Sequence, residues 1–196
     1  MSKINWKPGT MIYPVPAVMV SCGSNEDEYN IITIAWTGII CSDPAMCYIS
    51  VRPERYSYEI IKRNKSFVIN LTTKKLAYAT DWCGVRSGRE FDKFKEMKLT
   101  PMKAASVNAP IIEESPVNIE CIVKEIKPLG THDMFISEIV SINVSEKFID
   151  KKTDAFKLAK SSPIAYCHGK YYQLGEFVGK FGYSVQKKNR NKPNKD

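Results

Sequence analysis

Short apolar runs separated by turn-forming residues dominate the pattern of the chain. Such runs lie at 15–21, 30–40, 45–51 and 66–71. The 30–40 run, NIITIAWTGII, is rich in Ile and Thr, which predicts one strand buried on both faces. The sequence Ser42-Asp43-Pro44 then predicts a turn. The first half of the chain is therefore expected to be strand-rich.

The second half continues this pattern with longer strands. Residues 119–126 and 134–144 predict two strands joined through the turn Pro128-Leu129-Gly130. In the second strand apolar side chains alternate, the period expected when one face meets a core. They are Met134, Ile136, Val140, Ile142 and Val144. A hairpin is predicted around Gly169, over 164–174.

Helices are few and short in this pattern. One is predicted over 56–64, with Ser57 as a possible N-cap, another over 74–83 ending at Gly84, and a third over 154–160. At least six strands with no regular βαβ alternation predict a mainly β chain, a barrel or sandwich with short helical insertions.

Length and charge refine the domain organisation. The 196 residues suit one domain, and 29 Lys and Arg against 21 Asp and Glu give a net charge of +8. The last eleven residues, QKKNRNKPNKD, carry five basic residues and one acidic residue, so half of the net charge lies there. We therefore predict a folded domain over 1–185 and a basic, disordered tail over 186–196.

Several classes of protein are disfavoured. No apolar run approaches the ~20 residues of a membrane span, and Pro14 and Pro16 break the N-terminal apolar stretch, which lacks a cleavage site. We expect a soluble, cytoplasmic protein. Six scattered cysteines and two histidines predict neither a zinc cluster nor a disulfide framework. Neither GxGxxG, GxxxxGK[ST] nor GxSxG is present, so any catalysis is expected to depend on a bound cofactor.

The most informative stretch is 30–60, NIITIAWTGIICSDPAMCYISVRPERYSYEI. With the later pieces CGVRSGREFDKF, GTHDMFISEIVSI and YYQLGEFVGKFG, it resembles the flavin reductase-like family, and within it the flavoredoxins. The resemblance runs from Pro16 to about Tyr183. It implies an FMN-binding split β-barrel that forms a homodimer.

Three residues after the 45–51 strand fit the flavin phosphate. Arg52, Arg55 and Ser57 fall where this strand gives way to the 56–64 helix, whose free N–H groups and dipole favour an anion. Guanidinium and hydroxyl groups there would complete an anion pocket. The alternative is that the arginines are solvated loop charges and Ser57 is only a cap.

The resemblance places flavin-ring contacts along the 30–40 run. Asn30 would offer its amide, and Trp36 and Thr37 backbone N–H groups, to the edge of the ring. Cys41 would lie near the ring. The alternatives are an ordinary core aromatic for Trp36 and a small buried apolar group for Cys41.

Three further residues complete the implied cofactor site. Lys93 would place a cation at the phosphate or the flavin edge, and His132 would lie at the barrel mouth. Tyr166, in the late hairpin, would pack on the ring. A lone histidine at a turn is otherwise a surface residue.

The leading hypothesis is an FMN-binding oxidoreductase or electron-transfer protein that passes electrons through a non-covalently bound flavin. A flavin-binding module or redox sensor without turnover would use the same pocket and stays open. The electron donor would be a redox partner protein or NAD(P)H, although GTHDMF departs from the family's GDH-like segment and no nicotinamide site is visible. Binding of nucleic acid is disfavoured because the basic tail has no interleaved aromatic residues.

Overall fold

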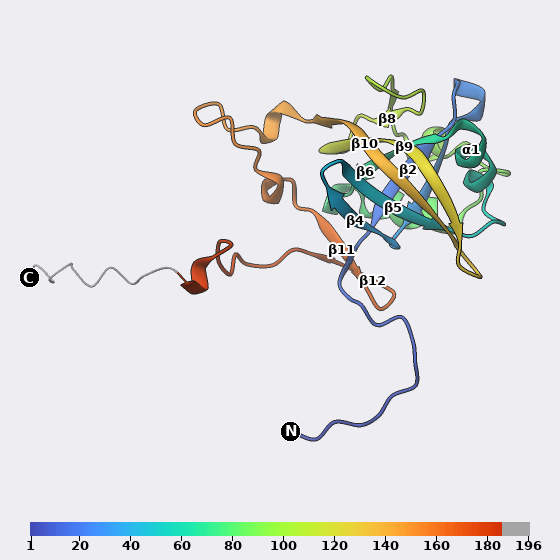
Figure 1. Cartoon of the computed structure of the whole chain (residues 1–196). Coiled ribbons are helices and arrows are strands. Elements are labelled where there is room, and N and C mark those ends of the chain that lie inside the picture. The colour runs from blue at the N-terminus through green and yellow to red at the C-terminus, as the bar shows by residue number, and fades with distance from the viewer. Residues whose placement is uncertain (186–196) are drawn as a thin grey trace, which may run out of the picture.

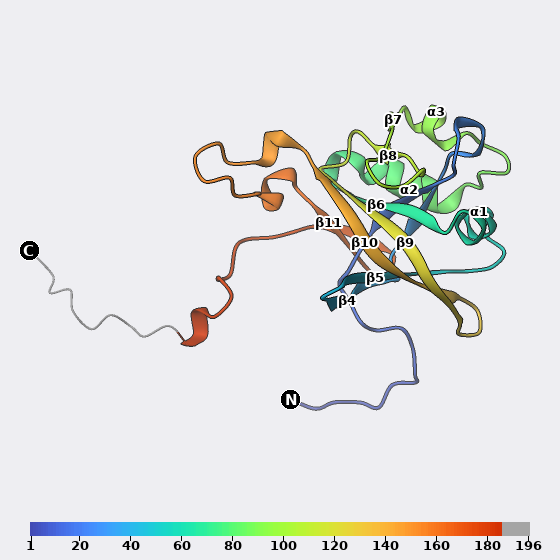
Figure 2. The same cartoon turned by 45° about the horizontal axis from the view of Figure 1, so that its top comes forward.

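The computed structural model describes residues 1–185, and a curled, seven-stranded antiparallel sheet dominates it (Figures 1 and 2). The order of its strands is β3 (Asn30–Ile34), β2 (Val18–Cys22), β6 (Ser66–Leu71), β9 (Val117–Pro128), β10 (Asp133–Val144), β5 (Ala45–Val51) and β4 (Thr37–Ser42). Strands β3 and β4 are neighbours in sequence but lie at opposite edges, so the sheet must curl. The backbone N–H of Ser50 donates to the carbonyl of Trp36 at 2.9 Å, where the chain crosses between the edges. This is a split barrel, and the mainly β prediction is confirmed.

Smaller elements surround the barrel. β1 (Val15–Pro16), β11 (Ile164–Cys167) and β12 (Lys170–Gln173) form a three-stranded sheet, and β7 (Pro101–Met102) pairs with β8 (Ile111–Ile112). The helices are α1 (Tyr56–Asn64), α2 (Ala77–Val85) and α3 (Lys93–Met97). Single 3-10 turns are η1 (Glu26–Glu28), η2 (Lys74–Leu76), η3 (Glu146–Phe148), η4 (Leu158–Ser161) and η5 (Tyr183–Val185). Within residues 1–185, none of the helices has the length and apolarity to span a membrane.

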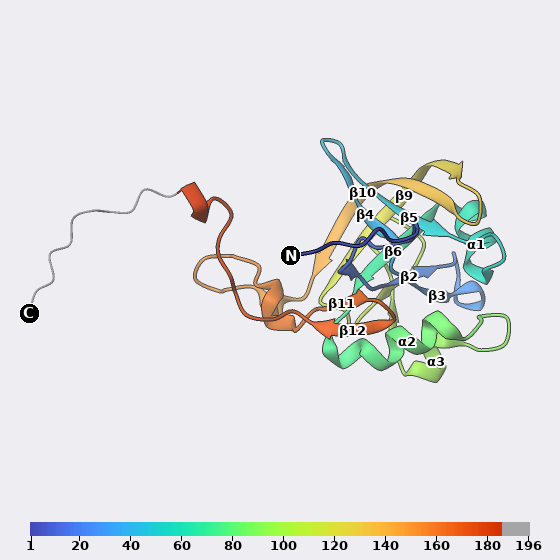
Figure 3. The ribbon, with the colours of Figure 1, turned by 90° about the horizontal axis from the view of Figure 1, so that it is seen from below.

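Two apolar clusters hold β2 and β3 from both sides. Inside the barrel, Tyr58 and Ile61 of α1 pack with Phe67 and Phe135. On the outer face, Met19 and Ile31 pack against α2 and α3, which cover the side of the barrel opposite β4 (Figure 3). Because both faces are buried, β2 and β3 form a rigid base for the residues that follow them.

The 30–40 run is two strands, not the single strand predicted. β3 ends at Ile34, and β4 starts at Thr37 on the other edge of the sheet. Only β3 is buried on both faces, while Ile39 of β4 is 70% exposed. A continuous apolar run carries no local signal for this crossing, because the crossing results from closure of the barrel.

The core face of β10 is also opposite to the predicted one. The residues that face the core are Asp133, Phe135, Ser137 and the partly buried Ile139. The buried Asp133 accepts a hydrogen bond from Tyr58 Oη at 2.5 Å, so polar residues are tolerated inside. The alternating apolar residues face outward, and Ile142 is 56% exposed.

The helix predictions are partly correct. The 56–64 helix is confirmed, but its N-cap is Arg55, and Ser57 is buried inside the first turn. The predicted 74–83 helix is η2 followed by α2, which continues to Val85. Only the 3-10 turn η4 forms where 154–160 was expected to be helical, because the backbone around Phe156 pairs with that around Ile149 in an antiparallel bridge. The predicted tail, 186–196, lies outside the described residues.

Candidate functional site

Two adjoining cavities open beside β3, α1 and the end of α2. The larger has a volume of about 810 Å³ and the smaller about 340 Å³. Ile32, Arg55 and Gly84 line both, so the two cavities adjoin at these residues. The larger volume lies within the usual range for ligand sites, about 300–1,000 Å³.

Buried polar groups form one wall of the smaller cavity. Asn30 Nδ2 donates to Ser57 Oγ at 2.7 Å. Lys93 Nζ donates to the carbonyls of Ile31 and Cys83, both at 2.7 Å, and only 3% of Lys93 is exposed. Burial lowers the pKa of Lys93 to about 8, so the amine still carries a charge at neutral pH. The fixed cation makes this wall attractive to an anion.

Arginines surround the same cavity. Arg55, Arg86 and Arg89 line it together with Lys93, against one carboxylate, that of Glu54. Arg89 Nη1 donates to the carbonyl of Glu54 at 3.1 Å and its guanidinium lies 5.5 Å from the ring centroid of Tyr56. The N-terminus of α1 opens here too, since Tyr56 and Ser57 are lining residues. Four cations and a helix N-terminus provide the chemistry of a phosphate site.

Close backbone approach shapes this wall. A Cβ on Gly88 would lie 2.2 Å from Asn30 Oδ1 and 2.7 Å from Tyr56 Cδ1. No side chain fits there without displacing Asn30. The loop at 86–89 can therefore approach β3 and α1 only with glycine at this position.

Aromatic rings line the larger cavity on two sides. Tyr13, Tyr166 and Tyr171 pack edge-on or tilted against one another, with centroids 6.1 and 5.7 Å apart. Tyr171 Oη donates to Asp81 Oδ1 at 3.2 Å, which ties β12 to α2. Trp36 and Tyr48 line the same cavity from the barrel. Such walls suit a planar aromatic ligand.

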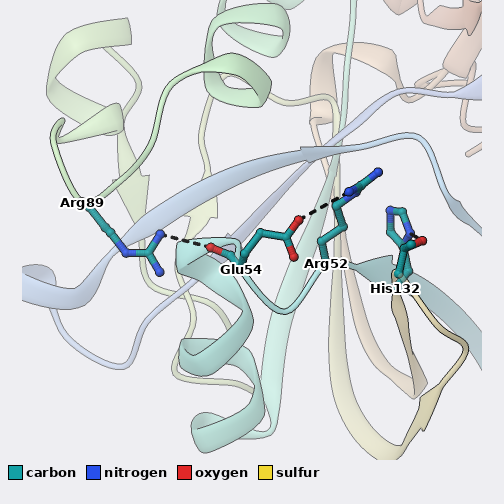
Figure 4. Close-up of polar contacts among 5 residues, drawn as sticks. Arg52, Glu54, Arg89 and His132 are labelled. Carbon is teal, nitrogen blue, oxygen red and sulfur yellow. Dashed lines mark hydrogen bonds and ion pairs between the residues drawn. The ribbon is translucent and has the colours of Figure 1, made fainter.

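A cation and a histidine, Arg52 and His132, line the larger cavity and lie side by side (Figure 4). Arg52 Nη1 lies 3.5 Å from Glu54 Oε1, and His132 lies beside Arg52. Burial, followed by the charge of Arg52, holds the pKa of His132 below its ordinary value. The imidazole is therefore neutral near pH 7. Its Nδ1 lies 3.0 Å from Thr131 Oγ1, and its Nε2 has no partner among the described residues.

The structure brings together eight of the ten residues predicted for the site. Asn30, Ser57 and Lys93 line the smaller cavity, and Arg55 lines both cavities. The larger cavity contains the remaining four, namely Trp36, Arg52, His132 and Tyr166. Arg52 is thus separated from Ser57, with which it was expected to share an anion pocket.

Two predicted residues line neither cavity. Thr37 Oγ1 donates to the carbonyl of Tyr48 at 2.6 Å, an interaction within the barrel wall. Cys41 lies near the far end of β4, with its Sγ 3.4 Å from the carbonyl of Asp43. The expected proximity of Cys41 to a flavin ring stays a prediction.

Sequence reasoning missed several lining residues. Arg86 and Arg89 flank Ser87-Gly88, and this cluster of arginines around a small-residue turn is a readable signal for an anion loop. Tyr13, Asp81 and Tyr171 gave no such signal, because they come from three distant segments that meet only in the fold.

Comparison with known proteins identifies the family of the chain. The family model for the flavin reductase like domain matches residues 10–175. The flavoredoxin of Desulfovibrio vulgaris (Miyazaki F) superposes with a TM-score of 0.86 at 29% identity, over 94% of this chain and 100% of that chain. The flavoredoxin from Methanosarcina acetivorans shares the fold, with a TM-score of 0.82 at 24% identity, over 95% of this chain and 100% of that one. An uncharacterized Pyrococcus abyssi protein is 28% identical over 137 residues, 70% of this chain and 78% of its own length.

The chain belongs to the flavin reductase-like family, and it is a flavin-based oxidoreductase or electron-transfer protein.

Proposed function

We propose that the chain binds FMN without a covalent bond, with the phosphate in the smaller cavity and the isoalloxazine ring in the larger one. The observation that carries this proposal is the junction of the two cavities at Ile32, Arg55 and Gly84. One cavity is cationic and the other aromatic, which matches the two ends of FMN. A flavin without a phosphate would leave the four cations of the smaller cavity without an anion.

The residues present fit this cofactor. A phosphate dianion would meet Arg55, Arg86, Arg89 and the N-terminus of α1, while Lys93 is too firmly held by two carbonyls to move toward it. Lys93 therefore supports the site as a fixed charge. At the other end Trp36 and Tyr166 offer apolar faces to the ring.

When bound, the flavin supplies two-electron or one-electron redox chemistry. The chain orients the ring between aromatic walls and excludes water from its faces. His132, whose Nε2 has no partner within residues 1–185, can exchange a proton with a ligand in the larger cavity. Arg52 beside it favours negative charge on whatever binds there.

The first experiment is the visible absorption spectrum of the purified protein, followed by chromatography of any chromophore released by heat. We expect a yellow protein that releases FMN. Titration of the apoprotein should then show FMN binding at least tenfold more tightly than riboflavin. Equal affinity for both flavins would contradict the phosphate assignment, and no flavin binding at all would contradict the proposal.

We also propose that the chain acts as a homodimer. Ile39 and Ile40 of the edge strand β4 and Ile142 of β10 are 70%, 48% and 56% exposed. The two terminal arms extend from the barrel (Figure 1) and expose further large apolar side chains. These are Ile4, Trp6, Ile12, Leu174, Phe177, Val178 and Phe181. Exposed apolar area of this kind is typical of an interface.

Light scattering after size-exclusion chromatography tests the proposed dimer. It should give a mass of about twice 22.3 kDa, and the mass of a monomer would contradict the proposal.

The electron donor is proposed to be a redox protein or NAD(P)H. Steady-state reduction of an acceptor with NADH, NADPH or a reduced iron–sulfur protein distinguishes an enzyme with turnover from a flavin-binding module. The cytoplasm is the proposed compartment, because all six cysteines are free thiols, as reducing compartments maintain them.

A further inference from the structure

A lysine-lined groove lies apart from the two flavin cavities. It has a volume of about 880 Å³ and runs between η2, the first turn of α2, the end of α3 and the turns η3 and η4. Its cationic side chains are Lys74, Lys75, Lys98, Lys147 and Lys160. Within residues 1–185, none of the five forms an ion pair. They are therefore available to an acidic ligand.

The rest of the lining points to a protein as this ligand. The buried Leu76, Ala79 and Leu99 contribute apolar surface, and Tyr78, 75% exposed, stands at the rim. Two carboxylates, of Glu96 and Glu114, also line the groove. Carboxylates repel a continuous phosphate backbone, whereas a protein surface offers donors to them and acidic side chains to the lysines.

Helix α2 connects this groove to the flavin cavities. Leu76, Tyr78 and Ala79 line the groove, and Gly84 and Val85 line the larger cavity. At 1.5 Å per residue, Ala79 and Gly84 are separated by roughly 7.5 Å along the helix axis. A protein seated on the lysines would lie against the helix that borders the proposed flavin site.

We propose that this groove docks a small acidic redox protein that delivers electrons to the flavin. The proposal rests on the proposed function. A reduced one-electron carrier gives up one electron at each encounter, so two encounters, with two protons from solvent, reduce one flavin fully. Clustered cations increase the rate of such encounters and make it sensitive to salt.

The test compares two double variants with equal changes in charge. Lys75→Glu with Lys160→Glu alters two sides of the groove, and Lys62→Glu with Lys124→Glu alters two exposed lysines outside it. Stopped-flow absorbance follows flavin reduction by a reduced, acidic [4Fe–4S] ferredoxin at low and high salt. We expect the groove variant to lower the second-order rate constant about tenfold or more at low salt, and the control to change it less than twofold.

Reduction by dithionite alone separates docking from flavin chemistry. It should proceed at the same rate in both variants and in the unaltered protein. An unchanged rate with ferredoxin in the groove variant would overturn the proposal. A groove variant that becomes monomeric would also overturn it, because the groove would then be an interface between copies. Loss of binding to a single-stranded oligonucleotide in the groove variant would overturn it as well. Failure of the proposed function would appear earlier, as absence of bound FMN.

Discussion

The two cavities differ in how far they are organised before a ligand arrives. In the smaller cavity Asn30, Ser57 and Lys93 already hydrogen-bond one another or backbone carbonyls and are almost fully buried. The larger cavity has a buried apolar floor that includes Ile34 and Val51, but Trp36, Arg52 and His132 on its wall are partly or largely exposed. The comparison indicates that the chain anchors its cofactor at one end and leaves the other end adaptable for chemistry.

The largest effect is expected when cations are removed from the smaller cavity, which tests whether this cavity anchors the phosphate. Arg86→Ala with Arg89→Ala, two residues that line only the smaller cavity, should weaken FMN binding roughly 100-fold, since each charge-assisted hydrogen bond contributes about 1.5–3 kcal/mol. Riboflavin, which lacks the phosphate, should bind as before. Fluorescence titration with both flavins measures this.

The matched control is Lys62→Ala with Arg63→Ala, which removes the same charge from α1 outside the cavity. This control should leave both affinities within twofold. Equal loss of FMN and riboflavin binding in the cavity variant would show that the arginines do not contact the phosphate.

Gly88→Ala tests the close packing of the smaller cavity. The added Cβ would collide with Asn30 Oδ1, so we expect a loss of about 1–3 kcal/mol in the free energy of unfolding and about tenfold weaker FMN binding. Urea denaturation and flavin titration measure the two effects. Gly175→Ala, with no atom within 4 Å of its Cβ, is the control and should change neither. An unaffected Gly88→Ala protein would mean that the loop moves freely.

Trp36→Ala tests the aromatic walls of the larger cavity. Because the ring is common to both flavins, their affinities should fall equally, about fivefold for a stacking contribution near 1 kcal/mol. Trp6→Ala, on the exposed N-terminal arm, is the matched control. A loss confined to FMN would assign Trp36 to the phosphate end.

The smallest effect expected is a titration at His132. Arg52→Ala should raise the pKa of His132 toward its ordinary value, because the neighbouring cation is removed. NMR of the imidazole Cε1–H resonance, assigned with His132→Asn, measures the change. If the pKa of His132 stays the same or falls in this variant, Arg52 does not contribute to lowering it.

The same shift affects folding stability. Since the folded pKa of His132 is lowered, the unfolded chain takes up a proton first as the pH falls. The contribution of neutral His132 to the free energy of unfolding is complete above the pKa of the unfolded chain. It is lost as the pH falls through the pKa of the folded chain. The unfolding free energy of His132→Asn should therefore depend less on pH on the acidic side of the ordinary histidine pKa.

Local sequence patterns predicted secondary structure correctly where all the signals for an element lie within the element and its flanking residues. The 56–64 helix and the Gly169 hairpin were predicted because turn residues and apolar spacing lie within a few residues of each other, although the predicted cap Ser57 lies inside the helix. The outward face of β10 shows the limit of such reasoning. Alternation identifies two faces but not which of them meets the core, and an apolar outer face is what a protein interface also requires.

Short stretches of the chain were enough to identify its family and most residues of the candidate site. Arg55 and Ser57 were recognisable from their place between a predicted strand and helix, and Lys93 and His132 from the resemblance to the family. Which of these residues share a cavity depends on the folded arrangement of the strands. Arg52 and Ser57 are five residues apart yet line different cavities, while Tyr13, Asp81 and Tyr171 line the same one. The physical reason is that closure of the sheet sets these distances, and closure depends on pairing between strands far apart in the chain.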